Sequence, residues 1–311
     1  MAKKPQKRWN VIIRWVGSIL SLAILVYLLN KIGLKETWVT VKQLSAWRIA
    51  AVLVLVFVSR LATFARWHTL LQVQDVKVHW KDSLKLTFAG LFASNVLPTT
   101  IGGDVFRLAG AVRLGIDSSL AAASLVTDRL VGMTGMLLVL PLAIPSVVIY
   151  LQQRDAQSVL PALFSAVFLT SAWEMIKGAV VKVSSNFKYW FKHPMILLQA
   201  LGFTFVHMLA TFLIIKILVE GMGDYIPFNK IAGLWSLTYF ISLIPVSING
   251  LGLQEVTITN LFSTLGGLEP STSISLAVIL RAVWMIGSLP GVFMLSGVLS
   301  GKETTDKKVE E

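Results

Sequence analysis

The sequence predicts an all-α integral membrane protein with about six full transmembrane helices and two oppositely oriented re-entrant hairpins, eight apolar segments in an inverted repeat. Three observations support this. The 311 residues are 55% hydrophobic and only 14% charged, with a mean hydropathy of +0.73, unlike soluble domains. Six apolar runs are close to the roughly 20 residues that a helix needs to cross a bilayer. Two further runs are interrupted by Pro, hydroxyl residues and Gly: "NVLPTTIGGDVFR" and "SLIPVSINGLGLQE".

The spans follow one another along the chain. The first follows the basic start "KKPQKRW" and no small-residue cleavage site comes after it, so we expect an uncleaved signal anchor. Pro141 and Pro145 fall where the third span has used its length, so we expect the apolar run to continue to Leu151 as a kinked or interfacial segment. The predicted spans are 11–29, 49–71, 118–141, 156–173, 194–216 and 272–297, and the interrupted stretches are 86–103 and 231–252.

The distribution of Lys and Arg predicts the orientation. If each interrupted stretch returns to the side from which it came, the cytoplasmic segments hold fifteen Lys and Arg residues and the outer segments hold six. We therefore expect a multi-pass protein of the cytoplasmic membrane with both termini in the cytoplasm. The predicted organisation is a first membrane half at 1–151 with a hairpin at about 86–114, a second half at 152–300 with a hairpin at about 231–266, and a disordered cytoplasmic tail at 301–311.

The two interrupted stretches resemble each other. "LPTTIGG" at 97–103 and "IPVSING" at 244–250 share Pro, Ile and Gly at an offset of 147 residues, which is close to half the chain and favours an internal duplication. Pro removes a backbone donor and Gly exposes the backbone, so polar groups become free for a ligand or a water-filled cavity. The alternative is a plain kink in a packed helix. The candidate ligand-binding residues are Asn95, Thr99, Thr100, Gly102, Gly103, Ser247, Asn249 and Gly250.

Charged residues inside the apolar segments are the other candidates. An arginine at the depth of Arg60 or Arg281 costs about 2.5–3.5 kcal/mol on insertion scales, so each needs a partner or a wet cavity. One interpretation is an internal ion pair; the other is a cradle for a lipid phosphate, which a guanidinium binds in a bidentate fork. The candidate phosphate-binding cations are Arg60, Arg107, Arg129 and Arg281, and the acids are Asp104, Asp128 and Glu255.

Sequence spacing separates the roles of the acids. Asp128 and Arg129 are adjacent, hence about 100° apart on a helix, so we expect them to contact different neighbours. Asp104 and Glu255 each follow an interruption, where a carboxylate can cap the next helix or carry a proton. We favour capping for Asp104 and proton exchange for Glu255.

The sequence lacks the residues that several kinds of functional site require. The chain has no cysteine, which excludes disulfides and thiolate catalysis, and its four histidines are scattered, so we expect no metal. No nucleotide-binding motif occurs, and we expect no cofactor. The net charge of +12 follows the topology pattern and suits anionic lipid headgroups, so we expect no nucleic-acid partner.

Three ordered segments resemble a known family. "NVLPTTIGGDVFR", "SLVTDRLVGM" and "IPVSINGLGLQE" look like signature segments of the lysylphosphatidylglycerol synthase transmembrane region family, also called flippase-like, over about residues 80–300. The family includes the membrane half of multiple peptide resistance factor proteins. The resemblance implies lipid translocation: in two-part members a soluble domain makes the aminoacyl lipid and the membrane part moves it outward. Because the sequence ends at "KETTDKKVEE", we expect no synthase domain.

The favoured function is a translocase that moves a phospholipid, aminoacyl-lipid or polyprenyl/glycolipid headgroup across the cytoplasmic membrane. Its partner would be an anionic or isoprenoid-linked lipid. Two alternatives stay open: a non-catalytic membrane partner of a separate lipid-modifying enzyme, and an intramembrane lipid-headgroup transferase. The absence of a nucleophile–base pair counts against the transferase, so we expect a transporter rather than an enzyme.

Overall fold

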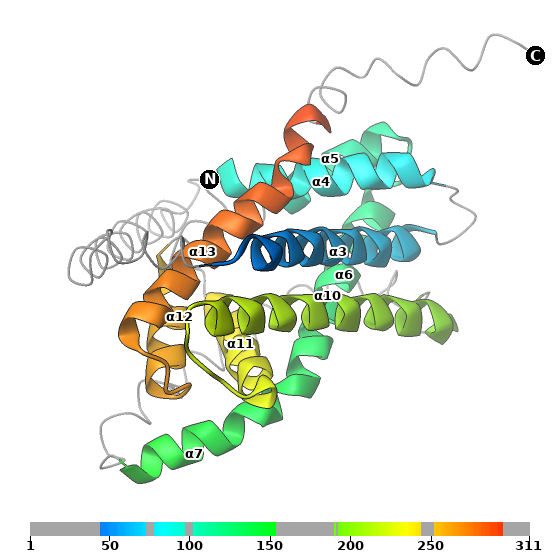
Figure 1. Cartoon of the computed structure of the whole chain (residues 1–311). Coiled ribbons are helices and arrows are strands. Elements are labelled where there is room, and N and C mark those ends of the chain that lie inside the picture. The colour runs from blue at the N-terminus through cyan, green and yellow to red at the C-terminus, as the bar shows by residue number, and fades with distance from the viewer. Residues whose placement is uncertain are drawn as a thin grey trace, which may run out of the picture. The chain divides into compact units, whose positions relative to one another are not determined.

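The computed structural model describes residues 44–72, 78–96, 102–153, 190, 192–243 and 252–294. Every regular element within these ranges is a helix, as the sequence predicts (Figure 1). In chain order the elements are α3 (Ala46–Leu71), α4 (Trp80–Val96), α5 (Gly102–Arg113), α6 (Ser118–Val139), the 3₁₀ turn η1 (Leu140–Ala143), α7 (Ile144–Gln153), α10 (Pro194–Gly221), α11 (Phe228–Ser242), α12 (Leu253–Thr264) and α13 (Pro270–Ser288).

Four described stretches are long and apolar enough to cross a membrane. They are Ala46–Leu71, Ser118–Gln152, Pro194–Gly221 and Pro270–Met294. They coincide with four of the predicted spans, 49–71, 118–141, 194–216 and 272–297, while the predicted spans 11–29 and 156–173 lie outside the described residues. Large apolar side chains such as Val54, Leu137, Leu198 and Met285 are exposed on these helices. Lipid contact accounts for that exposure, which water would disfavour.

The third predicted span is interrupted where its prolines fall. Helix α6 ends at Val139, and η1 follows with Pro141 in its first turn. Pro lacks the N–H that continues an α-helix, and its ring collides with the carbonyl four residues earlier. Pro145 is the second residue of α7, where a missing N–H costs nothing. The α-helical hydrogen bonding is therefore interrupted beside Pro141, within the predicted span 118–141, where the sequence leads us to expect a kink.

Helix α11 packs against this interruption. Ser236 Oγ donates a hydrogen bond to the Met136 carbonyl at 2.5 Å. A Cβ atom at Gly233 would lie only 2.4 Å from the Ala143 backbone nitrogen, so only glycine permits this approach. The bend in the α6–α7 segment is thus held by contacts from a helix about a hundred residues later in the chain.

The first interrupted stretch forms two helices that lie side by side. A Cβ atom at Gly103 would be 2.1 Å from Ser94 Oγ and 2.4 Å from the Gly90 carbonyl oxygen, and one at Gly110 would be 2.1 Å from a Leu86 methyl group. Because the contacts run in opposite directions along the two helices, α4 and α5 are antiparallel. Small residues permit this close approach. The connecting residues 97–101, with Thr99 and Thr100, lie outside the described residues.

The second interrupted stretch also forms two helices, α11 and α12. Residues 244–251, which include Ser247, Asn249 and Gly250, lie outside the described residues. Gly252 ends the interruption with a φ of 78°, a conformation that side chains other than glycine rarely adopt. Each interrupted stretch thus has one helix before and one helix after the residues that lie outside the described ranges.

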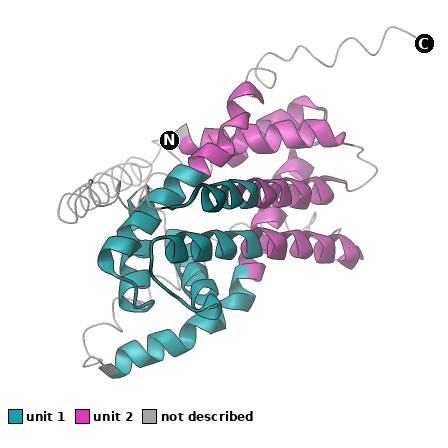
Figure 2. Cartoon of the chain, viewed as in Figure 1, with its two compact units in different colours: residues 1–55, 136–180, 209–283 teal, residues 56–135, 181–208, 284–311 magenta. Residues whose placement is uncertain are grey.

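The contacts divide the chain into two compact units (Figure 2). Unit 1 comprises residues 1–55, 136–180 and 209–283, and unit 2 comprises residues 56–135, 181–208 and 284–311. The boundaries fall inside α3, α6, α10 and α13, so neither unit is one continuous piece of chain. The predicted halves, 1–151 and 152–300, stay a prediction, because a repeat of sequence and a unit of packing are different divisions.

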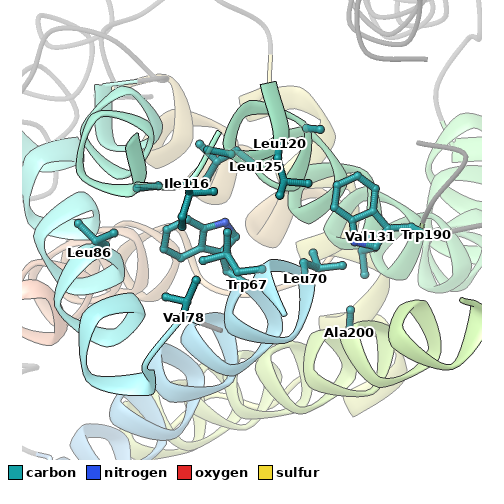
Figure 3. Packing of buried hydrophobic residues seen from close by; sticks show 14 residues of the cluster. Trp67, Leu70, Val78, Leu86, Ile116, Leu120, Leu125, Val131, Trp190 and Ala200 are labelled. Carbon is teal, nitrogen blue, oxygen red and sulfur yellow. The ribbon is translucent and has the colours of Figure 1, made fainter. Parts of the chain in front are cut away.

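Unit 2 has an apolar core around Trp67, whose side chain is fully buried beside Leu70, Ile116 and Leu125 (Figure 3). The Trp67 indole Nε1 donates a hydrogen bond to Ser124 Oγ at 3.2 Å. This bond fixes the orientation of the ring, because Trp has a single polar atom. The core therefore presents a rigid aromatic face to the polar residues of the same unit.

Candidate functional site

Asp128, on the membrane-spanning helix α6, is the centre of a charged cluster in unit 2. Its residue is 3% exposed. It accepts a hydrogen bond from Arg66 Nε on α3 at 2.6 Å and a second from Arg107 Nη1 on α5 at 3.3 Å. One carboxylate thus joins three helices and faces two guanidinium groups. A buried carboxylate in this setting is charged only because its partners replace the water that it has lost.

Arg107 connects this carboxylate to a second acid. Its Nη1 lies 3.3 Å from Asp104 Oδ1, and its guanidinium stacks over the Trp67 ring with the carbon 4.1 Å from the ring centroid. A Cβ atom at Gly90 would lie 2.7 Å from Arg107 Cγ, so glycine at that position leaves room for the side chain. Packing, aromatic stacking and charge therefore all hold Arg107 in one place.

Asp104 and Arg129 form the accessible edge of the cluster. Asp104 Oδ2 lies 2.5 Å from Arg129, whose side chain is 43% exposed, compared with 9% for Arg107. Asp128 and Arg129 thus contact different partners, and that prediction is confirmed. The bridge between Asp104 and Arg129 is the part of the cluster that a molecule from outside can reach without displacing the core.

Arg66 is the residue of the cluster that sequence reasoning missed. Its side chain is 12% exposed and also donates to Thr204 Oγ1 at 3.3 Å. The signal that could have found it is its position inside the predicted span 49–71. Two acids predicted at membrane depth, Asp104 and Asp128, also required cations to balance them.

A second bridge lies in unit 1, between Glu255 on α12 and Arg281 on α13. Glu255 is 2% exposed, and its other oxygen, Oε2, accepts a hydrogen bond from the Gly252 backbone nitrogen at 2.8 Å. Arg281 Nη2 also donates to Gln254 Oε1 at 3.4 Å. Glu255 therefore caps the amino end of α12, the role that the sequence favoured for Asp104. Proton exchange at Glu255 stays a prediction.

The two bridges occupy corresponding positions. Asp104 is the third residue of α5 and Glu255 the third residue of α12, and both helices have 12 residues. Arg129 and Arg281 are each the twelfth residue of the long helix that comes next. In both places an acid just after the interruption thus binds an arginine on the following span. The correspondence extends well beyond the seven aligned residues of the sequence motif.

The remaining predicted residues are placed as follows. Arg60, on α3, donates from Nη2 to the Trp284 carbonyl at 3.1 Å. Asn95, near the end of α4, donates to Ser288 Oγ at 2.6 Å, and Gly102 and Gly103 are the buried first residues of α5. No group of three His, Asp or Glu side chains able to hold a metal ion occurs among the described residues.

Comparisons with known proteins identify the family of the chain. No curated protein matches the chain by sequence. The sequence profile of one family, described as the Lysylphosphatidylglycerol synthase TM region, matches residues 14–291, which is most of the chain. Its extent includes both interrupted stretches and both acid–arginine bridges. The chain therefore belongs to the Lysylphosphatidylglycerol synthase TM region family, and it is a membrane protein related to lipids.

Proposed function

We propose that the chain is a flippase-like translocase that moves a lipid headgroup across the cytoplasmic membrane. The observation that carries this proposal is the charged cluster around Asp128 on a membrane-spanning helix, ending in the accessible bridge between Asp104 and Arg129. Buried ion pairs contribute little net stability compared with apolar packing, so their presence inside spans calls for another explanation. A polar path for a headgroup supplies one.

The mechanism follows from the two kinds of bridge residue. A lipid headgroup loses its water as it enters the bilayer, and a guanidinium can replace that water at a phosphate while a carboxylate replaces it at an ammonium group. Asp104 keeps a second partner, Arg107, when Arg129 moves away, so opening this bridge does not leave a buried acid unpaired. The Asp128 cluster stays fixed, and the Asp104–Arg129 bridge opens and closes.

The interrupted helices fit the same proposal. We infer that α4–α5 and α11–α12 are re-entrant hairpins, entering from opposite sides in an inverted repeat with both termini in the cytoplasm. The substrate would be an anionic or isoprenoid-linked lipid, including aminoacyl lipids, which a separate lipid-modifying enzyme would supply. The antiparallel packing of α4 on α5 and the corresponding bridges support this arrangement.

The test is transport by the purified chain. Vesicles containing a fluorescent phospholipid are treated with an impermeant quencher, so that only lipid reaching the outer leaflet is bleached. We expect vesicles with the chain to lose the protected fluorescence, and Arg129→Gln to slow that loss, because its bridge can no longer open and close. Lys216→Gln is the matched control, since Lys216 pairs with Glu220 within α10, away from either bridge in the sequence. Equal rates in vesicles with and without the chain would overturn the proposal.

A further inference from the structure

Arg60 differs from the other deep arginines in what it contacts. We propose that its guanidinium is a binding site for the phosphate group of a ligand, either in a lipid headgroup or as free phosphate. The inference deepens the proposed function, on which it rests for the source of the phosphate. It assigns unit 2 a second site for a lipid headgroup, in addition to the Asp104–Arg129 bridge.

The position of Arg60 makes its charge costly. It lies near the middle of the 26-residue helix α3, where the side chain does not reach the headgroup layer easily. An arginine at that depth needs a countercharge, a strong set of acceptors or water. The contacts that Arg60 makes within the described residues do not supply such a set.

These contacts leave most of the guanidinium unused. Nη2 donates to the Trp284 carbonyl at 3.1 Å, and the guanidinium carbon lies 4.9 Å from the centroid of the Trp284 ring. Nε is buried and has no hydrogen-bond partner. A guanidinium has five N–H donors, so one carbonyl and one aromatic face orient the group without neutralising it.

The other deep arginines are neutralised by acids. Arg66, Arg107 and Arg129 pair with Asp104 or Asp128, and Arg281 pairs with Glu255. No Asp or Glu among the described residues forms an ion pair with Arg60. The ion-pair interpretation therefore explains Arg281 and fails for Arg60, although the sequence offers the same alternatives for both.

The local balance of charge favours an anion. Among the described residues, the ion pairs of this cluster join three arginines, Arg66, Arg107 and Arg129, to two acids, Asp104 and Asp128. Arg60 adds to this positive excess. A bound anion would restore the balance.

Helix α13 packs closely beside Arg60 because residue 287 is a glycine. A Cβ atom there would lie 3.4 Å from Arg60 Nε and 2.3 Å from a Val56 methyl group. The Trp284 carbonyl uses Nη2 and not Nη1, and the end of a guanidinium that carries its two Nη groups presents two N–H groups that match two oxygens of a phosphate. The aromatic face of Trp284 then keeps this fork in one orientation.

The test measures binding rather than transport. The purified full-length chain, in a nonionic detergent without phosphate, is titrated with phosphatidylglycerol, with diacylglycerol of the same acyl chains, and with inorganic phosphate, while its thermal midpoint is followed. We expect phosphatidylglycerol to raise the midpoint and diacylglycerol to leave it unchanged. Arg60→Gln should weaken binding about 10- to 100-fold, the effect of losing a hydrogen-bonded charge. Lys216→Gln should bind like the wild type.

Two further variants sharpen the result. Repeating the comparison in an Arg129→Gln chain prevents the outer bridge from masking the effect. Arg60→Lys keeps the charge but not the fork, so it should bind phosphatidylglycerol more weakly than the wild type does. Without ligand, Arg60→Gln should be at least as stable as the wild type, because it removes an uncompensated charge; a purely structural arginine would give a lower midpoint and would overturn the proposal.

The outcomes distinguish this inference from the proposed function. An Arg60-dependent shift with inorganic phosphate alone assigns the site to free phosphate, and one with phosphatidylglycerol alone assigns it to the lipid. Equal binding by Arg60→Gln and the wild type to both probes overturns the phosphate site even if the chain moves lipid. Arg60-dependent binding by a chain that moves no lipid overturns translocation and leaves the site standing.

Discussion

Asp128 shows how a single carboxylate can hold a membrane unit together. It is 3% exposed and contacts both Arg66 and Arg107, so its removal takes a carboxylate away from two guanidinium groups at once. Breaking a buried ion pair from one side typically costs about 3–5 kcal/mol, far more than the net value of the intact pair.

We therefore expect Asp128→Asn to lower the thermal midpoint of the detergent-solubilised chain strongly. The double variant Asp128→Asn with Arg66→Gln should recover part of the loss, because it removes one of the two arginine partners together with the acid. The measurement is a double-mutant cycle on thermal midpoints. Strictly additive losses would show that the Asp128–Arg66 contact at 2.6 Å carries no coupling.

At the scale of elements, the approach of α4 to α5 depends on glycines. A Cβ atom at Gly103 would meet Ser94 Oγ at 2.1 Å and the Gly90 carbonyl at 2.4 Å, and a backbone atom cannot move aside as the end of a flexible side chain can. The two helices would have to separate, and Arg107 on α5 would move away from Asp128.

Gly103→Ala should therefore destabilise the chain by about 1–3 kcal/mol, the usual cost of overpacking. Gly202→Ala, on α10, is the control: a Cβ atom there meets nothing within 4 Å, and Ala is the better helix former. Thermal unfolding of both variants checks the prediction. Equal midpoints for Gly103→Ala and the wild type would mean that α4 and α5 are not packed this closely.

Much of the helical architecture could be predicted, and much of the cluster could not. Hydropathy and length locate α3, α6, α10 and α13, because crossing a bilayer requires a run that one-dimensional sequence displays directly. That Asp128 and Arg129 contact different partners could be predicted, because adjacent residues point about 100° apart on a helix. The pairing of Arg66 with Asp128 did not, because it depends on how two distant helices are set against each other. Arg60 and Arg281 looked equivalent for the same reason, and only tertiary contacts separate them.

At the scale of the whole molecule, the positive residues predict a direction in the membrane. Residues 174–193 should face the cytoplasm, and residues 220–229 and 266–272 should face outward. Since the chain has no cysteine, each position can be probed by one introduced thiol without altering any other residue.

In intact cells, an impermeant thiol reagent should label Tyr225→Cys, whose residue is 70% exposed, and should label Ser185→Cys only after the membrane is opened. The pair controls for itself, because the reagent and the background are the same. Labelling of Ser185→Cys from outside would invert the proposed orientation. It would also reverse the side from which each hairpin enters.

The Asp128 cluster also sets an order in which the chain can mature. On the ribosome, Arg66 is made 62 residues before its carboxylate, and Arg107 is made 21 residues before it. Arg66 lies near the end of α3, where its side chain reaches the headgroups while it waits. Arg107 sits within the short helix α5, which has 12 residues and cannot cross the bilayer by itself. On the proposed re-entrant topology, the α4–α5 pair reaches its final arrangement only after α6 has been made, so the acid that organises unit 2 also sets the order of its assembly.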